Sequence, residues 1–365
     1  MRCTRSRPTC YRCARRHESV VLQRASTFRN NRQTAAMRLA TFNLESLDEA
    51  PKSEVPLKER IAVLRPQIER MCADILCLQE VNAQRRGGQS HRTFDALDQL
   101  LDGTTYARFH RAHSLAGDHD GPADVHNLVT LSRWPICSVR QIRHAFVPPL
   151  AYRSLTAHPA SQEPQDISFE RPILACDIEV ADGLSIMIVN VHLRAPLAVP
   201  IRGQKLAPFV WRSASAWAEG YALAAWKRSA QALEVRLFVD DVLDTDPNAR
   251  IIVAGDFNAE DHETPMKILL AAEEDTGNGL LATRSLVMLD RSLAGDRRFS
   301  TLHHGRPQML DHILISRSLL AAYRGLEVHN ETLGDELVGF GRIRPLTSSY
   351  HAPVIARFEL SPLEA

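Results

Sequence analysis

Hydrophobic and polar residues follow two patterns along this chain, and each predicts a different element. Short apolar runs bounded by turn residues are typical of buried strands, whereas apolar residues at every third or fourth position are typical of amphipathic helices. The strand pattern occupies residues 39–42, 74–80, 127–136, 171–180, 184–192, 251–254, 311–316 and 354–360. The helical pattern occupies residues 56–72, 94–101, 213–243 and 266–273.

The long helix predicted at residues 213–243 separates two halves that are rich in predicted strands. Its apolar face is predicted to contain Leu223, Trp226, Ala230, Leu233 and Leu237. The runs 171–180 and 184–192 flank Ala181-Asp-Gly183, which predicts a hairpin. Residues 144–168 and 193–212 show neither pattern and are expected to be loops. This arrangement fits two sheets packed face to face with helices outside.

Polar side chains lie at the ends of several predicted strands. They are Asn43, Glu80, His192, Asp256, Asn258, Asp311 and His351. If the strands belong to sheets that pack together, their ends can converge on one rim. Carboxylates and amides supply the oxygen ligands that Mg²⁺ or Mn²⁺ take, and histidines suit acid–base chemistry or donation to a phosphate oxygen. Each residue alone also has an ordinary explanation, such as a strand that runs into an Asx turn at Asp256.

Composition places the chain among ordinary globular proteins. Its 365 residues are 44% hydrophobic and 24% charged, which allows a large core in one big domain or two smaller ones. No apolar run approaches the ~20 residues of a membrane span, and no apolar segment typical of a signal peptide follows the basic N-terminus. We therefore expect a cytoplasmic protein without a transmembrane segment, and the sequence indicates no protein partner.

Charge is distributed unevenly along the chain. Nine arginines and one glutamate give residues 1–36 a charge of +8, which leaves −7 for residues 37–365 of the total of +1. The mildly acidic body is not typical of a protein that binds long nucleic acids through many phosphate contacts. Residues 1–36 are predicted to be a disordered basic extension. Either translation starts at Met37, or the segment is a basic arm for nucleic-acid binding or targeting.

The ordered set of motifs resembles the endonuclease/exonuclease/phosphatase (DNase I-like) superfamily from about residue 37 to 360. The matching segments are Thr41-Phe-Asn43, Leu78-Gln-Glu-Val81, Asn127 with Leu131-Ser-Arg-Trp-Pro135, Asn190-Val-His192, Gly255-Asp-Phe-Asn258, Leu310-Asp-His-Ile313 and Ser349-Tyr-His351. Single motifs of this kind are weak signals, but their order and spacing are specific. The resemblance implies an α+β fold, a four-layered αββα sandwich of two mostly antiparallel sheets, in one domain spanning residues 37–363.

The resemblance also implies roles for individual residues around a Mg²⁺ ion, with Mn²⁺ as the alternative. Glu80 would be the principal metal ligand, with Asn43 nearby. Asp256 and Asn258 would position or deprotonate the attacking water and hold the phosphate.

The remaining residues of the implied site would contact the substrate. His192 would touch the phosphate or the leaving side, and His351 would be paired with and oriented by Asp311. Arg171 and Asn127 would bind the substrate phosphate.

One position departs from the family pattern. Tyr350 stands where the family usually has an aspartate that helps to hold metal. Because a phenol is a far poorer Mg²⁺ ligand than a carboxylate, the second carboxylate is either lost or supplied elsewhere, with Glu45 or Asp48 as alternatives.

The expected function is a Mg²⁺-dependent phosphoester hydrolase, most simply a phosphodiesterase or nuclease that uses an activated water. Its substrate would be a nucleotide, a nucleic acid or a lipid headgroup. The alternatives are a phosphomonoesterase or lipid-headgroup phosphodiesterase of the same family, or a degenerate member that binds a phosphorylated ligand without turnover. Residues 194–228 carry interleaved cations and aromatics that either select substrate or form a helix with aromatics packed inward and solvated cations.

Overall fold

The computed structural model describes residues 35–49, 55–88, 90–117, 121–336 and 347–360. These residues belong to one compact unit that runs from Thr34 to Ala365. The predicted basic extension therefore lies outside the described residues except for Ala35 and Ala36. These two residues pair with Leu360 and Glu359, so the first strand begins two residues before Met37.

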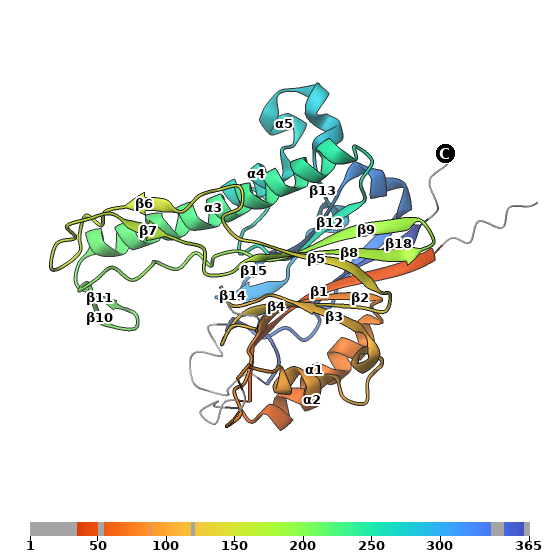
Figure 1. Ribbon diagram of the computed structural model, residues 1–365, viewed down its shortest axis with the longest axis horizontal. Helices are drawn as coiled ribbons and strands as arrows, with labels where there is room; N and C mark the ends of the chain where they lie inside the picture. Colours follow the sequence, from red (N-terminus) through yellow and green to blue (C-terminus); the bar gives the residue numbers. More distant parts are fainter. Residues whose placement is uncertain (1–34, 50–54, 89, 118–120, 337–346, 361–365) are drawn as a thin grey trace, which may run out of the picture. The chain divides into compact units, whose positions relative to one another are not determined.

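Two six-stranded sheets form the centre of the unit (Figure 1). The first sheet has, in spatial order, β17 (Tyr323–Val328), β18 (Val354–Leu360), β1 (Ala35–Leu47), β2 (Ile75–Val81), β4 (Asn127–Ser132) and β3 (His110–His113). The second has β13 (Val287–Met288), β16 (Asp311–Ile315), β12 (Ile251–Asp256), β9 (Leu184–His192), β8 (Ile173–Ala181) and β5 (Ile136–Ile142). Each sheet contains one parallel pair, β1–β2 or β9–β12, and its other pairs are antiparallel.

Helices α1 (Leu57–Met71) and α2 (Asp95–Leu101) cover the outer face of the first sheet, and α3 (Ala214–Thr245) and α4 (Thr264–Leu270) cover that of the second. The short α5 (Glu273–Thr276) has no buried residue. Single 3₁₀ turns occupy Thr105–Arg108, Gly279–Arg284, Leu289–Ser292 and Arg317–Ala322. None of the helices within the described ranges is long and apolar enough to cross a membrane.

Three apolar clusters hold these four layers together. The central cluster joins the facing sides of the sheets and includes Leu39 and Ile75 from one sheet with Ile188 and Ile313 from the other. A second cluster lies between the first sheet and α1 with α2, and a third lies between the second sheet and α3 with α4. The predicted αββα sandwich is confirmed.

Several local predictions are wrong. Residues 144–168 contain the hairpin of β6 (Leu150–Tyr152) and β7 (Gln165–Ile167), and residues 193–212 contain β10 (Lys205–Ala207) and β11 (Val210–Trp211). A third small hairpin pairs β14 (Thr301–His303) with β15 (Arg306–Gln308). Strands of two or three residues are too short to give a periodic pattern.

The face of α3 that contacts the sheet also differs from the predicted face. Leu233 and Leu237 are 39% and 36% exposed, whereas Val235 and Val239 are completely buried. Apolar residues occur all around this helix, so spacing alone does not identify the buried side. Pro66 does not end α1, which continues through it to Met71.

Candidate active site

Strand register brings three of the predicted site residues side by side. On the second sheet, Asp256 at the end of β12 pairs with His192 at the end of β9 and with Asp311 at the start of β16. Because β9 and β12 are parallel and β16 is antiparallel to β12, the carboxyl ends of the first two strands meet the amino end of the third. All three residues are buried, with 3%, 1% and 0% exposure for His192, Asp256 and Asp311.

Gly255 allows the end of β12 to approach β9 closely. Its φ is +151°, and a Cβ at this position would lie 2.0 Å from the carbonyl oxygen of Val191. Any side chain would force the strands apart beside Asp256. The glycine in the Gly255-Asp-Phe-Asn258 motif therefore has a packing reason of its own.

Asp256 is the hub of the cluster. Its Oδ2 accepts hydrogen bonds from Nδ2 of Asn43 at 3.0 Å and Nδ2 of Asn258 at 3.1 Å, and its Oδ1 accepts from the Asn258 backbone N–H at 2.8 Å. His192 Nε2 lies 3.3 Å from Oδ2. Burial raises the pKa of Asp256 to about 6, although His351 acts in the opposite direction. The carboxylate is thus held ready to accept a proton near neutral pH.

Asp311 and His351 form an oriented acid–imidazole pair. His351 Nδ1 lies 2.7 Å from Asp311 Oδ2, and its Nε2 points toward Asp256 Oδ2 at 3.9 Å. Burial acts to lower the pKa of His351, but Asp311 and Asp256 together raise it well above the usual range. The imidazole is therefore protonated, donates to Asp311 through Nδ1, and can offer its Nε2 proton to a bound anion.

Glu80 lies on the neighbouring sheet, close to His192. Its Oε1 is 3.6 Å from His192 Nε2, and its Oε2 accepts hydrogen bonds from the Ser46 backbone N–H at 2.9 Å and hydroxyl at 3.1 Å. Burial acts to raise the pKa of Glu80, but His126, Arg171 and His351 lower it overall. Glu80 is therefore an ionised carboxylate, which is the form that binds a cation.

Strained backbone is concentrated around this cluster. Nine non-glycine residues of the described chain have positive φ. Five of them belong to the segments that carry the site, namely Glu45, Ser46, Glu80, His126 and Asn258. Such conformations cost about 1–3 kcal/mol each and persist only where the surroundings enforce them. Their clustering is typical of a functional site.

The loop after β12 is fixed by contacts from beneath. Arg228 on α3 donates to the Asn258 carbonyl oxygen and to Glu263 at 2.7 Å. His312 Nε2 lies 2.9 Å from the Ala259 carbonyl oxygen, and its Nδ1 lies 2.6 Å from Asp290 Oδ2. These contacts hold Asn258 at φ +49°, with its amide directed to Asp256 and the Leu193 carbonyl oxygen. His312, for which the sequence predicts no role, supports this loop.

The two predicted phosphate-binding residues differ in their surroundings. Arg171 donates to the Leu193 carbonyl oxygen at 3.2 Å and interacts electrostatically with Glu80 and Asp256. Asn127 uses its amide on the backbone instead, because it donates to the Val81 and Ala123 carbonyl oxygens and accepts from the Ala123 N–H. Its side chain therefore secures the chain that leads into β4.

The residues offered as replacements for the missing aspartate are also distinguishable. Asp48 is hydrogen-bonded by the amides of Asn82 and Gln84 at 3.2 Å and 2.7 Å. Burial raises the pKa of Glu45 to about 7, and Glu45 interacts electrostatically with His351 and Glu80. Burial and Glu45 raise the pKa of Tyr350, so its phenol stays neutral. Glu45 is the better placed of the two carboxylates.

One residue of the cluster was not predicted. His126 directly precedes Asn127, and its Nδ1 lies 3.7 Å from Glu80 Oε2. The available signal was a histidine directly before a matching motif, next to a residue already selected. Contacts also join seven of the nine predicted residues, namely Asn43, Glu80, His192, Asp256, Asn258, Asp311 and His351.

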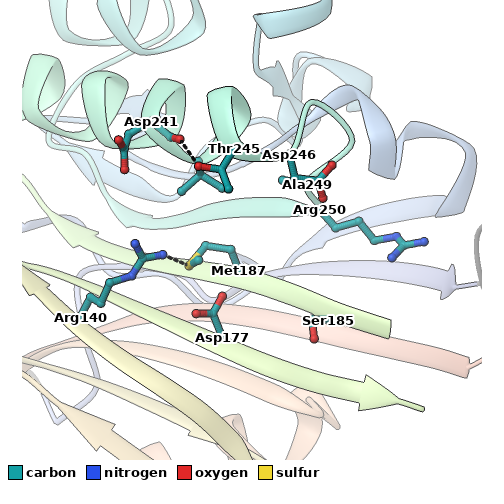
Figure 2. Close-up of a pocket in the computed structure, with 10 residues that line it drawn as sticks. Arg140, Asp177, Ser185, Met187, Asp241, Thr245, Asp246, Ala249 and Arg250 are labelled. Atoms are coloured by element: carbon teal, nitrogen blue, oxygen red, sulfur yellow. Dashed lines mark hydrogen bonds between the residues drawn. The ribbon is translucent and has the colours of Figure 1, made fainter. Parts of the chain in front are cut away.

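A cleft of about 270 Å³ lies at the opposite end of β12 (Figure 2). It is lined by the carboxyl-terminal part of α3, including Asp241, and by Arg250, which directly precedes β12. Arg140 and Met187 face it from the sheet, joined by a hydrogen bond of 3.7 Å. Asp256 lies six residues along the strand from Arg250, about 20 Å at the usual rise, so the cleft is not part of the cluster.

The fold and the motif order are matched by known proteins. A sequence profile of the Endonuclease/Exonuclease/phosphatase family matches residues 40–351. The chain belongs to this family. Members of the family are enzymes that hydrolyse phosphoester bonds, so the chain is an enzyme of this class. No curated protein matches the sequence significantly.

Solved structures share the fold at low sequence identity. Truncated TDP2 from Caenorhabditis elegans has a TM-score of 0.52 at 14% identity, over 89% of this chain and 98% of that one. A family protein from Bacteroides vulgatus has a TM-score of 0.53 at 16% identity, over 90% of this chain and 100% of that one. A family protein from Leptotrichia buccalis gives 0.50 at 16% identity, over 89% and 100%.

The cluster fits the divalent metal ion on which enzymes of this family generally depend. Ligand atoms of Asp256, Asp311 and His351 lie within 4.8 Å of one another, but a protonated His351 has no lone pair for a metal ion, so the carboxylates of this group are its metal-binding members. Oδ1 of Asp311 and Nδ1 of His126 are buried without a hydrogen-bond partner in the part of the chain that the structure describes. Buried polar atoms without partners are costly, and a cation near the carboxylates would compensate for this.

Proposed function

We propose that this endonuclease/exonuclease/phosphatase family member is a phosphodiesterase that requires Mg²⁺ or Mn²⁺ and acts by in-line attack of an activated water. The observation that carries the proposal is the convergence of an oriented Asp311–His351 pair, an Asp256 carboxylate whose pKa is about 6 and an ionised Glu80. One of these carboxylates is ionised and the other can take up a proton near neutral pH. Two such carboxylates beside a cationic imidazole are suited to acid–base hydrolysis.

Each side chain has a role that follows from its contacts. Glu80, with Asn43 and Asp256 beside it, would hold the metal ion, which supplies charge neutralisation for the phosphate when bound. Asp256 accepts the proton of the attacking water and is kept in place by Asn258. Protonated His351 donates its Nε2 hydrogen to a phosphate oxygen, with Asp311 fixing the ring.

Two further residues support a diester substrate. His192 is neutral because burial, Arg171 and His126 lower its pKa well below the usual value. A neutral imidazole can donate a hydrogen bond to a phosphate oxygen or to the leaving oxygen without adding a positive charge beside the metal ion. Arg171 lies close enough to Glu80 and Asp256 for its guanidinium to attract the phosphate from the side.

A projecting arm is our proposed substrate-selecting surface. We define the arm as residues 143–170 and 193–222, which include β6, β7, β10, β11 and the first turns of α3 (Figure 1). Residues 193–218 hold four cations and no acidic residue, in contrast to the acidic body. Of the aromatics, Trp217 and Tyr221 are 47% and 41% exposed and Trp211 and Trp226 are half-buried, so the alternative of inward packing describes only part of the set, and Phe209 beside them is 86% exposed.

The arm favours an anionic substrate with apolar or aromatic parts. Lys205 lies over the Trp211 ring at 4.6 Å, so cation and aromatic already occur together. Nucleotides, short nucleic acids and lipid headgroup diesters share this chemistry. The cytoplasmic location, the domain limits at residues 37 and 363 and a start at Met37 stay predictions.

A second function is favoured by one observation. Tyr350 replaces the family's aspartate with a neutral phenol. This substitution is compatible with a site that has lost turnover and only binds a phosphorylated ligand. The intact Asp311–His351 pair argues for hydrolysis, since ligand binding alone needs no oriented acid–imidazole pair.

The test is hydrolysis of a phosphoester panel with Mg²⁺ or Mn²⁺, with and without EDTA. The panel contains single-stranded and duplex DNA, RNA, sphingomyelin, inositol phosphates and bis(p-nitrophenyl) phosphate. We expect EDTA-sensitive diester turnover that Glu80→Ala abolishes and the exposed control Glu274→Ala leaves unchanged. A silent wild-type protein whose turnover appears in Tyr350→Asp would establish the binding function instead.

A further inference from the structure

His126 occupies an unusual position beside the proposed metal site. It precedes β4 with a φ of +58°, a conformation that is uncommon outside glycine. Its backbone N–H donates to Oδ1 of Asn82 at 3.0 Å, and the next residue, Asn127, is tied to Val81 and Ala123. The surrounding amides therefore enforce this backbone conformation, and it directs the imidazole toward Glu80.

The imidazole nitrogen that faces the site has no hydrogen-bond partner among the described residues. This atom, Nδ1 of His126, is buried, although the side chain as a whole is 34% exposed. Its 3.7 Å separation from Glu80 Oε2 is too long for a hydrogen bond. The same Glu80 oxygen instead accepts hydrogen bonds from the Ser46 N–H and hydroxyl. The pair is thus close together without a direct bond that would account for it.

The separation does fit two ligands of one divalent ion. Metal–ligand bonds to imidazole nitrogen and carboxylate oxygen are about 2.0–2.2 Å long, so two ligands of one ion lie at most about 4.2 Å apart. The His126–Glu80 distance of 3.7 Å meets this limit, as does the 3.6 Å between His192 Nε2 and the other Glu80 oxygen. A cation beside Glu80 would give Nδ1 of His126 the partner that it lacks.

We propose that His126 is a nitrogen ligand of the divalent ion held at Glu80 and makes this site bind transition metal ions, Mn²⁺ among them and Co²⁺ as their spectroscopic probe, more tightly than Mg²⁺. The inference rests on the metal site of the proposed function. Carboxylate and amide oxygens suit Mg²⁺, whereas imidazole binds later divalent ions much more tightly. Tyr350 acts in the same direction, since it removes an oxygen ligand.

The test compares the binding of Co²⁺ and Mg²⁺ to the full chain by titration calorimetry, together with the visible absorption of bound Co²⁺. His126→Asn keeps a residue that tolerates left-handed backbone but replaces nitrogen by oxygen. We expect its Co²⁺ affinity to fall about tenfold or more while its Mg²⁺ affinity changes less than about threefold. The Co²⁺ absorption spectrum should change in the same variant.

Two further variants keep the result interpretable. His304→Asn is the matched control, because His304 has a φ of +54° in an exposed turn, and its spectrum and affinities should equal those of the wild type. His126→Gly takes the same backbone conformation without strain and repeats the comparison if the asparagine variant folds poorly.

Two outcomes would overturn the inference and are distinguishable. Unchanged affinities in His126→Asn, or equal losses for Co²⁺ and Mg²⁺, would remove His126 from the ligand set and leave the metal site in place. Failure of the wild-type protein to bind either ion would overturn the metal site itself, and the role of His126 with it.

Discussion

Strand β16 begins with two neighbouring residues that each belong to an aspartate–histidine pair, and the two pairs differ in what surrounds them. Asp311 pairs with His351 at the rim, and His312 pairs with Asp290 beneath it. Successive residues of a strand point to opposite faces of the sheet, so one-residue spacing separates the two pairs. The distances, 2.7 Å and 2.6 Å, are nearly equal.

The pairs differ in the atoms left for other partners. Both nitrogens of His312 are engaged, one by Asp290 and one by the Ala259 carbonyl oxygen, and the ring is fully buried. His351 has one nitrogen on Asp311, and its Nε2 faces Asp256 at 3.9 Å, beyond hydrogen-bond range. The comparison teaches that a short acid–histidine contact does not identify a reactive group. A reactive group is identified by a nitrogen at the rim that is free to bind another partner, as Nε2 of His351 is.

The largest expected effect is a difference in activity between variants of His351 and His312. His351→Gln should lower kcat on a phosphodiester by about 10²–10⁴-fold, because the proton donor at the phosphate is lost. His312→Gln, measured per folded molecule, should lose less than about tenfold, since it acts only through the loop of Asn258. Steady-state hydrolysis of bis(p-nitrophenyl) phosphate measures both, and equal losses would break the distinction.

Stability should separate the same two variants in the opposite order. His312→Gln cannot satisfy both Asp290 and Ala259 and leaves a buried carboxylate poorly paired, which costs about 3–5 kcal/mol. His351→Gln keeps a donor beside Asp311 at the partly exposed rim and should cost less than about 2 kcal/mol. Urea unfolding followed by circular dichroism gives both values, and a reversed order would contradict the assignment.

The pH dependence of stability sharpens the account of the deeper pair. Burial acts to lower the pKa of His312, but Asp290 raises it overall above the usual value. A histidine whose folded pKa is raised stabilises the fold fully below its unfolded pKa of about 6.5, and this contribution disappears as pH rises through the folded pKa. Unfolding free energies of wild type and Asp290→Asn should therefore converge at alkaline pH. A gap that stays constant from acid to alkaline pH would refute the linkage.

The smallest expected effect concerns how His351 is positioned. The Ser349 hydroxyl accepts from the His351 backbone N–H at 3.0 Å and donates to the Asn43 carbonyl oxygen at 2.7 Å. Ser349→Ala removes both bonds, worth about 0.5–1.5 kcal/mol each, and should reduce kcat by about 2–10-fold with little change in KM. A KM effect alone would place Ser349 in substrate binding instead.

Much of the fold and the cluster was predictable because the chain is locally consistent. The apolar runs that became β1, β2, β9, β12 and β16 are long enough to show strand character, and their ends carry the polar residues. Parallel pairing of β9 with β12 then places His192 beside Asp256, which strand ends alone do not specify. The order of the motifs, through the family resemblance, indicated that these residues lie together, which the periodicity of apolar residues could not indicate.

The rest depended on tertiary contacts that leave no local pattern. The hairpins of the arm have strands of two or three residues and are held partly by Glu219, which accepts from the Leu155 and Thr156 N–H groups. His126 reaches Glu80 only because its backbone is left-handed, which the sequence does not reveal. Asn127 is where the motif places it, but its amide serves the backbone.

The most direct test of the central claim compares Asp311→Asn with Asp290→Asn in metal-dependent hydrolysis of bis(p-nitrophenyl) phosphate. The two substitutions are chemically identical and remove the carboxylate from the rim pair or from the pair beneath it. We predict EDTA-sensitive turnover in the wild type, a loss of about 10²-fold or more in Asp311→Asn, and a change under about tenfold per folded molecule in Asp290→Asn. Equal losses in the two variants, or turnover that EDTA does not affect, would contradict the account.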